Sequence, residues 1–219
     1  MRVLLVPSPL LGRAVYAPFA EALRGRGHTV RTADVAVGEE DSPEPLAGRI
    51  AAAGAGVDLV VPHSNAGRFA AGAAAVDGAA VVYVDALVPE VPVPPALADF
   101  VRGQVAPDGL LPGWTHWWPP ADLAEAVPKG LLGELERSQP RVHPGFLLAD
   151  PGPVPGWREQ RAAYLAFGEA YAVERAVAEE AGWPTRTLDG GHLHLVVEPD
   201  LVAAEVEDLA RGLLRRLPA

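Results

Sequence analysis

Short apolar runs alternate with amphipathic stretches along most of the chain. Six runs have the length and the apolar, partly β-branched character of strands, at 3–6, 29–33, 57–61, 80–84, 162–167 and 185–188. Stretches with apolar residues at helical spacing predict helices at 16–26, 45–53, 65–75, 169–181 and 199–217. This alternation is typical of a parallel sheet covered by helices on both faces. The pattern therefore predicts an α/β protein with three layers, α/β/α.

A segment of different composition separates the fourth strand-like run from the fifth. Residues 88–160 hold fourteen of the 23 prolines and four of the five tryptophans. Because proline lacks a backbone N–H and fixes φ, we expect short helices and turns here rather than sheet. The length of 219 residues fits one domain. We therefore predict a single domain at 1–219 with a cap inserted at about 88–160.

The composition excludes several classes of protein. Eighteen basic and 28 acidic residues give a formal net charge of −10, which disfavours binding to nucleic acid or to an anionic membrane surface. The chain has no cysteine, which excludes disulfide scaffolds and thiol catalysis. No apolar run approaches the roughly 18 to 20 residues of a membrane span, and no charged leader precedes the first strand. We expect a cytoplasmic protein, and nothing in the chain indicates its oligomeric state.

The first candidate for chemistry follows the third strand-like run. Residues 60–67 read Val-Val-Pro-His-Ser-Asn-Ala-Gly, which places Ser64 at a tight turn between a buried strand and a helix N-terminus. The N–H groups that open such a helix carry partial positive charge and can stabilise an oxyanion. The alternative is that Ser64 only caps its helix, since serine is among the preferred N-cap residues.

The second candidate lies near the C-terminus, where residues 189–199 read Asp-Gly-Gly-His-Leu-His-Leu-Val-Val-Glu-Pro. Together with the strand, turn and helix around Ser64, this Gly-His segment ahead of Pro199 resembles the α/β-hydrolase superfamily over essentially the whole chain. The resemblance implies a Ser-His-acid triad with Ser64 as nucleophile and His192 as general base. It makes His194 a neighbour rather than the catalytic histidine.

The resemblance also implies an acid and an oxyanion hole. The acid of this superfamily most often follows the fifth strand, which favours Glu169, and Asp85 at the end of the fourth strand is the alternative acid. The N–H of Asn65 is the first expected oxyanion donor. The second usually comes from the loop after the first strand, where Pro9 has no N–H, so we expect it from Leu10.

The superfamily's strand order predicts how the sheet is arranged. It implies a trimmed, mostly parallel sheet of about six strands in the order 29–33, 3–6, 57–61, 80–84, 162–167, 185–188. Ligands of open parallel sheets bind at the carboxyl ends of the strands, beside the point where the order reverses. Ser64 and the loop 7–11 are expected at that point.

Aromatic and histidine side chains suggest how the site is lined. We expect Tyr16, His63, Trp114, Trp117 and Trp118 to line a substrate pocket, the alternative for the tryptophans being that they pin the cap to the sheet. His63, His192 and His194 raise the question of a metal. The remaining ligands of a hydrolytic metal motif are missing, and no glycine-rich phosphate loop follows a strand, so we expect no metal and no cofactor.

The resemblance implies a serine hydrolase that cleaves a small ester, thioester or amide and whose partner is therefore a small-molecule substrate. The superfamily also includes lyases and cyclases of biosynthetic pathways, so a lyase or cyclase is the alternative function. A catalytically inactive ligand-binding protein is the third possibility. Reaction with a fluorophosphonate separates the first class from the last.

Overall fold

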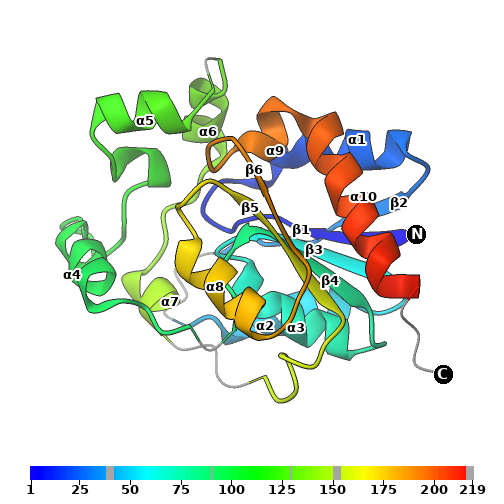
Figure 1. The fold of residues 1–219 in the computed structure, drawn as a ribbon. Coiled ribbons are helices and arrows are strands. Elements are labelled where there is room, and N and C mark those ends of the chain that lie inside the picture. Colours follow the sequence, from blue (N-terminus) through cyan, green and yellow to red (C-terminus); the bar gives the residue numbers. More distant parts are fainter. Residues whose placement is uncertain (38–41, 90, 129, 150–153, 216–219) are drawn as a thin grey trace.

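A six-stranded parallel sheet forms the centre of the molecule in the computed structural model, which describes residues 1–37, 42–89, 91–128, 130–149 and 154–215 (Figure 1). The strands are β1 (Arg2–Val6), β2 (Thr29–Thr32), β3 (Leu59–Ser64), β4 (Ala80–Ala86), β5 (Ala162–Phe167) and β6 (Thr185–Leu188). Their order is β2-β1-β3-β4-β5-β6, and all five pairings are parallel. The expected fold class and strand order are confirmed.

The side chains of the strands alternate between two hydrophobic cores. Leu4, Val60 and Tyr83 belong to the core on one face, and their neighbours Leu5 and Val61 belong to the core on the other. Successive side chains of a strand point to opposite faces, so strands covered on both sides must be apolar throughout. The inner strands β3, β4 and β5 are accordingly buried at every position, whereas the edge strands β2 and β6 are partly exposed.

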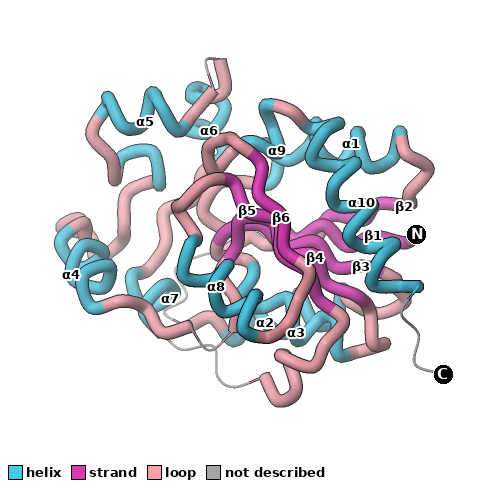
Figure 2. Tube along the Cα trace, in the orientation of Figure 1, coloured by secondary structure: helices cyan, strands magenta, loops and turns pink. Residues whose placement is uncertain are grey.

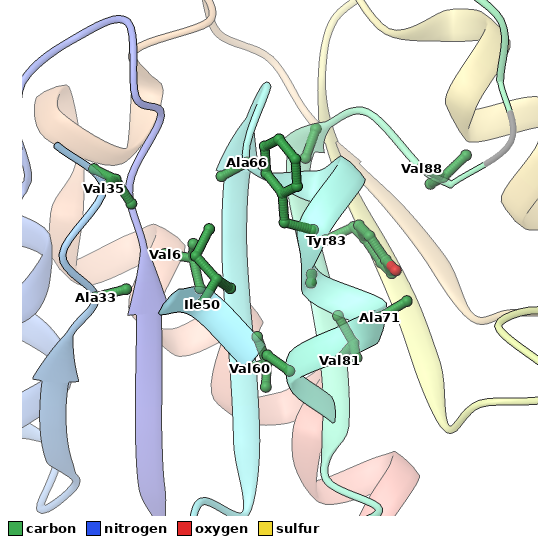
Figure 3. Close-up of a cluster of buried hydrophobic side chains, with 14 of the residues drawn as sticks. Val6, Ala33, Val35, Ile50, Val60, Ala66, Ala71, Val81, Tyr83 and Val88 are labelled. Atoms are coloured by element: carbon green, nitrogen blue, oxygen red, sulfur yellow. The ribbon is translucent and has the colours of Figure 1, made fainter. Parts of the chain in front are cut away.

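Helices cover both faces of the sheet (Figure 1). One face carries α2 (Glu44–Ala53), α3 (Gly67–Ala75) and α8 (Ala172–Glu180), whose buried side chains join the core that Figure 3 shows in part. The other carries α1 (Ala17–Gly25) and α10 (Pro199–Arg215). The end of the helix expected at 199–217 falls on 216–217, outside the described residues. Within the described ranges, none of the helices has the length and apolarity that a bilayer crossing requires.

The segment between β4 and β5 is made of short helices and loops, as its prolines predict (Figure 2). Its helical elements are α4 (Pro95–Gly103), the 3₁₀-helix η2 (Trp114–His116), α5 (Pro120–Ala126), α6 (Leu132–Ser138) and α7 (Pro144–Leu148). Buried Arg68 on α3 donates hydrogen bonds to the carbonyl oxygens of Leu147 and Ala149, at 3.0 and 2.6 Å. These bonds attach this segment to the helix that follows Ser64.

Several boundaries differ from the expected ones. Strands β3 and β4 run further than their apolar cores, to Ser64 and Ala86, because the two strands stay paired there through a register irregularity after His63. A 3₁₀-helix, η1 (Arg13–Tyr16), precedes α1, and α9 (His194–Val197) was not expected at all. A four-residue helix has too little periodicity to be recognised in a sequence.

Helix α3 begins unusually close to the end of β4. A Cβ atom at Gly67 would lie 1.8 Å from the carbonyl oxygen of Leu87, and the nitrogen of Leu87 donates to the carbonyl oxygen of Ser64 at 3.0 Å. Only glycine fits at this distance, because the obstructing atom belongs to the backbone. The turn after β3 is therefore held against the loop after β4.

We expect a glycine-to-alanine substitution to change the free energy of unfolding in opposite directions at two positions of α3. Gly67→Ala should lower the free energy of unfolding by about 1–3 kcal/mol or more, because the backbone must move apart. Gly72→Ala, where a Cβ atom meets nothing within 4 Å, should raise it by up to about 1 kcal/mol through helix propensity. Urea unfolding of both variants is the measurement, and equal effects would contradict the close approach.

Candidate active site

Ser64 lies at a strained turn at the end of β3. Its φ is 58°, a left-handed conformation that costs a residue other than glycine of order 1–3 kcal/mol. Its side chain does not cap α3, whose N-cap is Ala66 and has no side-chain hydrogen bond. The capping alternative therefore does not hold. Such a strained strand-to-helix turn is how the nucleophile of an α/β-hydrolase is presented.

The two expected oxyanion donors differ in their surroundings. In the part of the chain that the structure describes, the N–H of Asn65 has no hydrogen-bond partner. The N–H of Leu10 donates to the hydroxyl of Ser8 at 3.3 Å, and the N–H of Leu11 donates to the carbonyl oxygen of Ser8 at the same distance. The turn after Ser64 thus offers a free donor, whereas the donors of the loop after β1 are engaged within that loop.

His192 is bound to a buried carboxylate. Its Nδ1 lies 2.7 Å from Oδ2 of Asp85, whose side chain is fully buried. Because a carboxylate only accepts, Nδ1 carries the proton of this bond and Nε2 of the neutral ring is left as a base. The His192 side chain is 14% exposed, so the imidazole is accessible from one edge.

Residues of β5 hold the carboxylate of Asp85 and the backbone that follows it at the end of β4. Its second oxygen, Oδ1, accepts a hydrogen bond from the N–H of Phe167 on β5 at 2.9 Å. The hydroxyl of Tyr164 accepts from the N–H of Ala86 at 3.0 Å and donates to its carbonyl oxygen at 2.7 Å. Asp85 itself has a φ of 40°. A buried carboxylate needs such partners, and the strained backbone turns it toward His192.

Glu169, the acid that the resemblance favoured, is not brought to His192. Its side chain is 77% exposed and pairs with Arg175 at 3.2 Å on the surface. Helix α8 begins at Ala172, three residues later than expected, so Glu169 lies in a surface turn before the helix. The structure brings the alternative, Asp85, into contact with His192 instead.

His63 belongs to a buried chain of hydrogen bonds beneath the site. Its Nε2–H donates to the backbone carbonyl oxygen of His192 at 2.9 Å, because a carbonyl only accepts. Its Nδ1 therefore accepts from the hydroxyl of Tyr16 at 2.7 Å, and that hydroxyl accepts from the N–H of Ser8 at 2.9 Å. The side chains of His63 and Tyr16 are almost completely buried. These hydrogen bonds join the loop after β1, the end of β3 and the loop after β6, which carry the candidate site.

The same surroundings keep His63 neutral. Burial lowers its pKa well below the ordinary 6.5, and the neighbouring His192 lowers it further. The rings of His63 and His192 are stacked, with centroids 4.5 Å apart. A neutral His63 can therefore lie against His192 without repelling the positive charge that a base acquires.

Tyr171 is a site residue that sequence reasoning did not identify. Its hydroxyl lies 3.3 Å from Oγ of Ser64, and its ring stacks with that of His192 at 5.3 Å. It stands three residues after Gly168, in the turn after β5 where the acid of the superfamily is most often found, and this position is the one signal in the sequence that points to it. Ser64 and His192 are thus linked through one phenol.

The aromatic side chains expected in a substrate pocket have other contacts. Tyr16 is buried beneath the site, as described. Trp117 is buried and donates from Nε1 to the carbonyl oxygen of Pro112 at 2.8 Å. Trp118 is 38% exposed and stacks with Phe100 of α4 at 5.7 Å. Trp114 packs against both cores. The packing of Trp114 and Trp117 with the cores fits the alternative that tryptophans pin the cap to the sheet, whereas the contact of Trp118 lies within the cap. A direct contact with substrate stays a prediction.

His194 packs its ring against Phe167, with centroids 5.4 Å apart. Over the described ranges, no group of three or more histidine and acidic side chains is arranged to hold a metal ion.

Comparison with known proteins identifies the fold. No family model and no curated protein sequence matches the chain. The chain is similar to the solved structure of an extracellular α/β-hydrolase from a Paenibacillus species, which is described as sharing structural and functional homology with tobacco salicylic acid binding protein 2. The TM-score is 0.74 and the identity is 15%, and the match covers 96% of this chain and 98% of the other.

Two further solved structures are similar over nearly the whole chain. One is a variant of tomato methylketone synthase I in complex with beta-ketoheptanoate, with a TM-score of 0.70, 10% identity and 97% and 98% of the two chains covered. The other is a pyrethroid hydrolase from Sphingobium faniae, with a TM-score of 0.67, 17% identity and the same coverage. At these identities the likeness is one of fold.

The neutral state of His63 predicts a pH dependence of stability. Between its lowered pKa and about 6.5 the unfolded chain binds a proton that the folded protein does not, so the free energy of unfolding falls as the pH drops through that window. The loss approaches about 1.4 kcal/mol per pH unit for one group. His63→Gln keeps a donor and an acceptor but cannot be protonated.

Urea unfolding of wild type and His63→Gln from pH 8 to 5 checks this. The variant should be less stable at pH 8, and the gap should narrow below pH 6.5. The pKa of His28 is also lowered, by burial above all, and this residue is present in both proteins, so the difference between the curves isolates His63. Parallel curves would show that His63 is not held neutral.

Proposed function

We propose that the protein is a serine hydrolase that cleaves a small ester, thioester or amide. The α/β-hydrolase fold of the chain, which esterases and other hydrolases share, supports this proposal. The observation that carries the proposal is the 2.7 Å bond between His192 and buried Asp85, next to a serine at a left-handed turn. In the proposal Ser64 is the nucleophile, His192 the general base and Asp85 the acid.

The acylation step follows from these positions. Oγ of Ser64 forms a bond to the carbonyl carbon of the substrate while its proton passes to Nε2 of His192. Asp85 keeps Nδ1–H directed at itself and stabilises the positive charge on the imidazolium. When the tetrahedral intermediate collapses, the bond to the leaving group breaks and His192 returns the proton to the leaving oxygen, sulfur or nitrogen.

Deacylation repeats the step with water. His192 takes a proton from water as its oxygen attacks the acyl carbon, and it gives that proton to Oγ of Ser64 as the acyl bond breaks. The products are a carboxylic acid and the free enzyme. In both steps the carbonyl oxygen becomes negatively charged, and the N–H of Asn65, which has no hydrogen-bond partner among the described residues, is the donor that we assign to it. The second donor, expected from Leu10, requires that its bond to Ser8 be exchanged for one to the substrate.

The proposal predicts which side chains a fluorophosphonate probe depends on. Wild-type protein should gain the mass of one adduct, and Ser64→Ala should gain none. His192→Ala and Asp85→Asn should label about 10³- to 10⁴-fold more slowly, because the serine is no longer activated. Glu169→Gln should label within about twofold of wild type, because an exposed ion pair contributes little. Intact-protein mass against time is the measurement.

The labelling rates of the variants distinguish Asp85 from Glu169 as the acid, and a hydrolase from the other classes of protein. Loss of labelling in Glu169→Gln with full labelling of Asp85→Asn would return the acid role to Glu169. If folded wild-type protein forms no adduct with fluorophosphonates of several alkyl sizes, the hydrolase proposal fails. A lyase, cyclase or ligand-binding protein is then favoured.

A further inference from the structure

Tyr171 contacts the reacting atoms, yet the mechanism above leaves it without a role. It lies in the turn between β5 and α8, and its hydroxyl and ring contact Ser64 and His192 respectively. Among the described residues, Oγ of Ser64 is the one hydrogen-bond partner of the Tyr171 hydroxyl. Within the described part of the chain, the phenol therefore binds no group that competes with the serine.

The surroundings of Tyr171 keep its hydroxyl protonated. Burial raises its pKa above the ordinary 10, and the nearby carboxylates of Asp85 and Glu174 raise it further. At neutral pH the side chain is a neutral phenol that carries a proton to donate and cannot act as a base. Since its partner is a serine oxygen that must give its own proton to His192, the phenol is suited to be the donor of this hydrogen bond.

We propose that Tyr171 is a catalytic residue of this site, whose hydroxyl donates a hydrogen bond to Oγ of Ser64 whenever that oxygen carries negative charge. This inference rests on the proposed hydrolase function. In acylation the charge develops as the Ser64 proton moves to His192, and it passes to the carbonyl oxygen as the bond to the carbonyl carbon forms. In deacylation it develops as the acyl bond breaks, and the proton that His192 gives to Oγ neutralises it. Tyr171 keeps its proton throughout, so the steps balance as written above.

A hydrogen bond of this kind accelerates the reaction because it strengthens as the charge appears. Bonds to charged oxygens contribute about twice as much as bonds between neutral groups, so the transition state gains more than the resting enzyme. The bond also orients the serine. When one lone pair of Oγ accepts from Tyr171, the O–H of Ser64 is left to donate to His192.

The test compares two phenol-to-phenyl substitutions. Tyr171→Phe removes the hydroxyl and keeps the ring that stacks with His192. Tyr83→Phe removes a buried hydroxyl that has no hydrogen-bond partner among the described residues and lies away from Ser64 in the core of one sheet face. The rates of fluorophosphonate labelling and of p-nitrophenyl acetate acylation and deacylation are measured for both by stopped flow.

Tyr171→Phe should slow labelling, acylation and deacylation by roughly ten- to a hundredfold, the loss expected for one hydrogen bond to a charged atom. The melting temperature and the KM for p-nitrophenyl acetate should change little. Tyr83→Phe should stay within about twofold of wild type. Equal or faster rates in Tyr171→Phe, with Ser64→Ala still inactive, would overturn the role of Tyr171 and leave the hydrolase standing. Absence of labelling in wild type would overturn both.

A fluorinated tyrosine at 171 gives a second measurement if Tyr171→Phe does not fold. Fluorine lowers the pKa of the phenol while the shape of the side chain is kept, and a phenolate cannot donate. The deacylation rate should then fall as the pH rises through that lowered pKa, at a pH where the wild-type rate is constant. Identical pH profiles for the two proteins would overturn the proposal.

Discussion

The contact between the start of α3 and the loop after β4 is the constraint on which the candidate site depends. Gly67 allows the turn after β3 to lie against the backbone at Leu87, and Ser64 in that turn has a left-handed conformation. The same contact places Ser64 beside Asp85, whose backbone is strained in the same way. Two strained residues at adjacent strand ends persist only because buried, fully paired strands hold them.

Burial determines how charge is arranged around these two residues. The aromatic and imidazole groups nearest to the site, Tyr16, His63 and Tyr171, are kept neutral by their surroundings. The ion pair available to the site is that of Asp85 with a protonated His192, and both oxygens of the carboxylate are hydrogen-bonded. In a low-dielectric environment charges interact strongly, and the imidazole of His192 is the group on which the proposed mechanism places a positive charge.

The acid shows where sequence reasoning reached its limit. Asp85 follows an apolar run and was visible as a polar residue at a strand end, but so was Glu169, and the superfamily's usual position favoured the latter. The choice depends on which carboxylate the backbone turns inward. Which carboxylate contacts His192 is decided by the pairing of β4 with β5, by the hydrogen bonds between the Tyr164 hydroxyl and the backbone of Ala86, and by the late start of α8. None of these is encoded in the local pattern of residues.

The strands and the helices that cover them followed from the sequence, because hydrophobic periodicity and turn residues act over a few neighbouring positions. The order of the strands, and Ser64 and His192 as candidate reactive residues, followed from the resemblance to the α/β-hydrolase superfamily. The tertiary structure decided three further contacts. These are the contact of Asp85 with His192, the buried hydrogen bonds that link Ser8, Tyr16 and His63, and the hydrogen bond between Tyr171 and Ser64. Each joins residues far apart in the chain, and such contacts exist only once the parallel strands bring their carboxyl ends to one edge of the sheet.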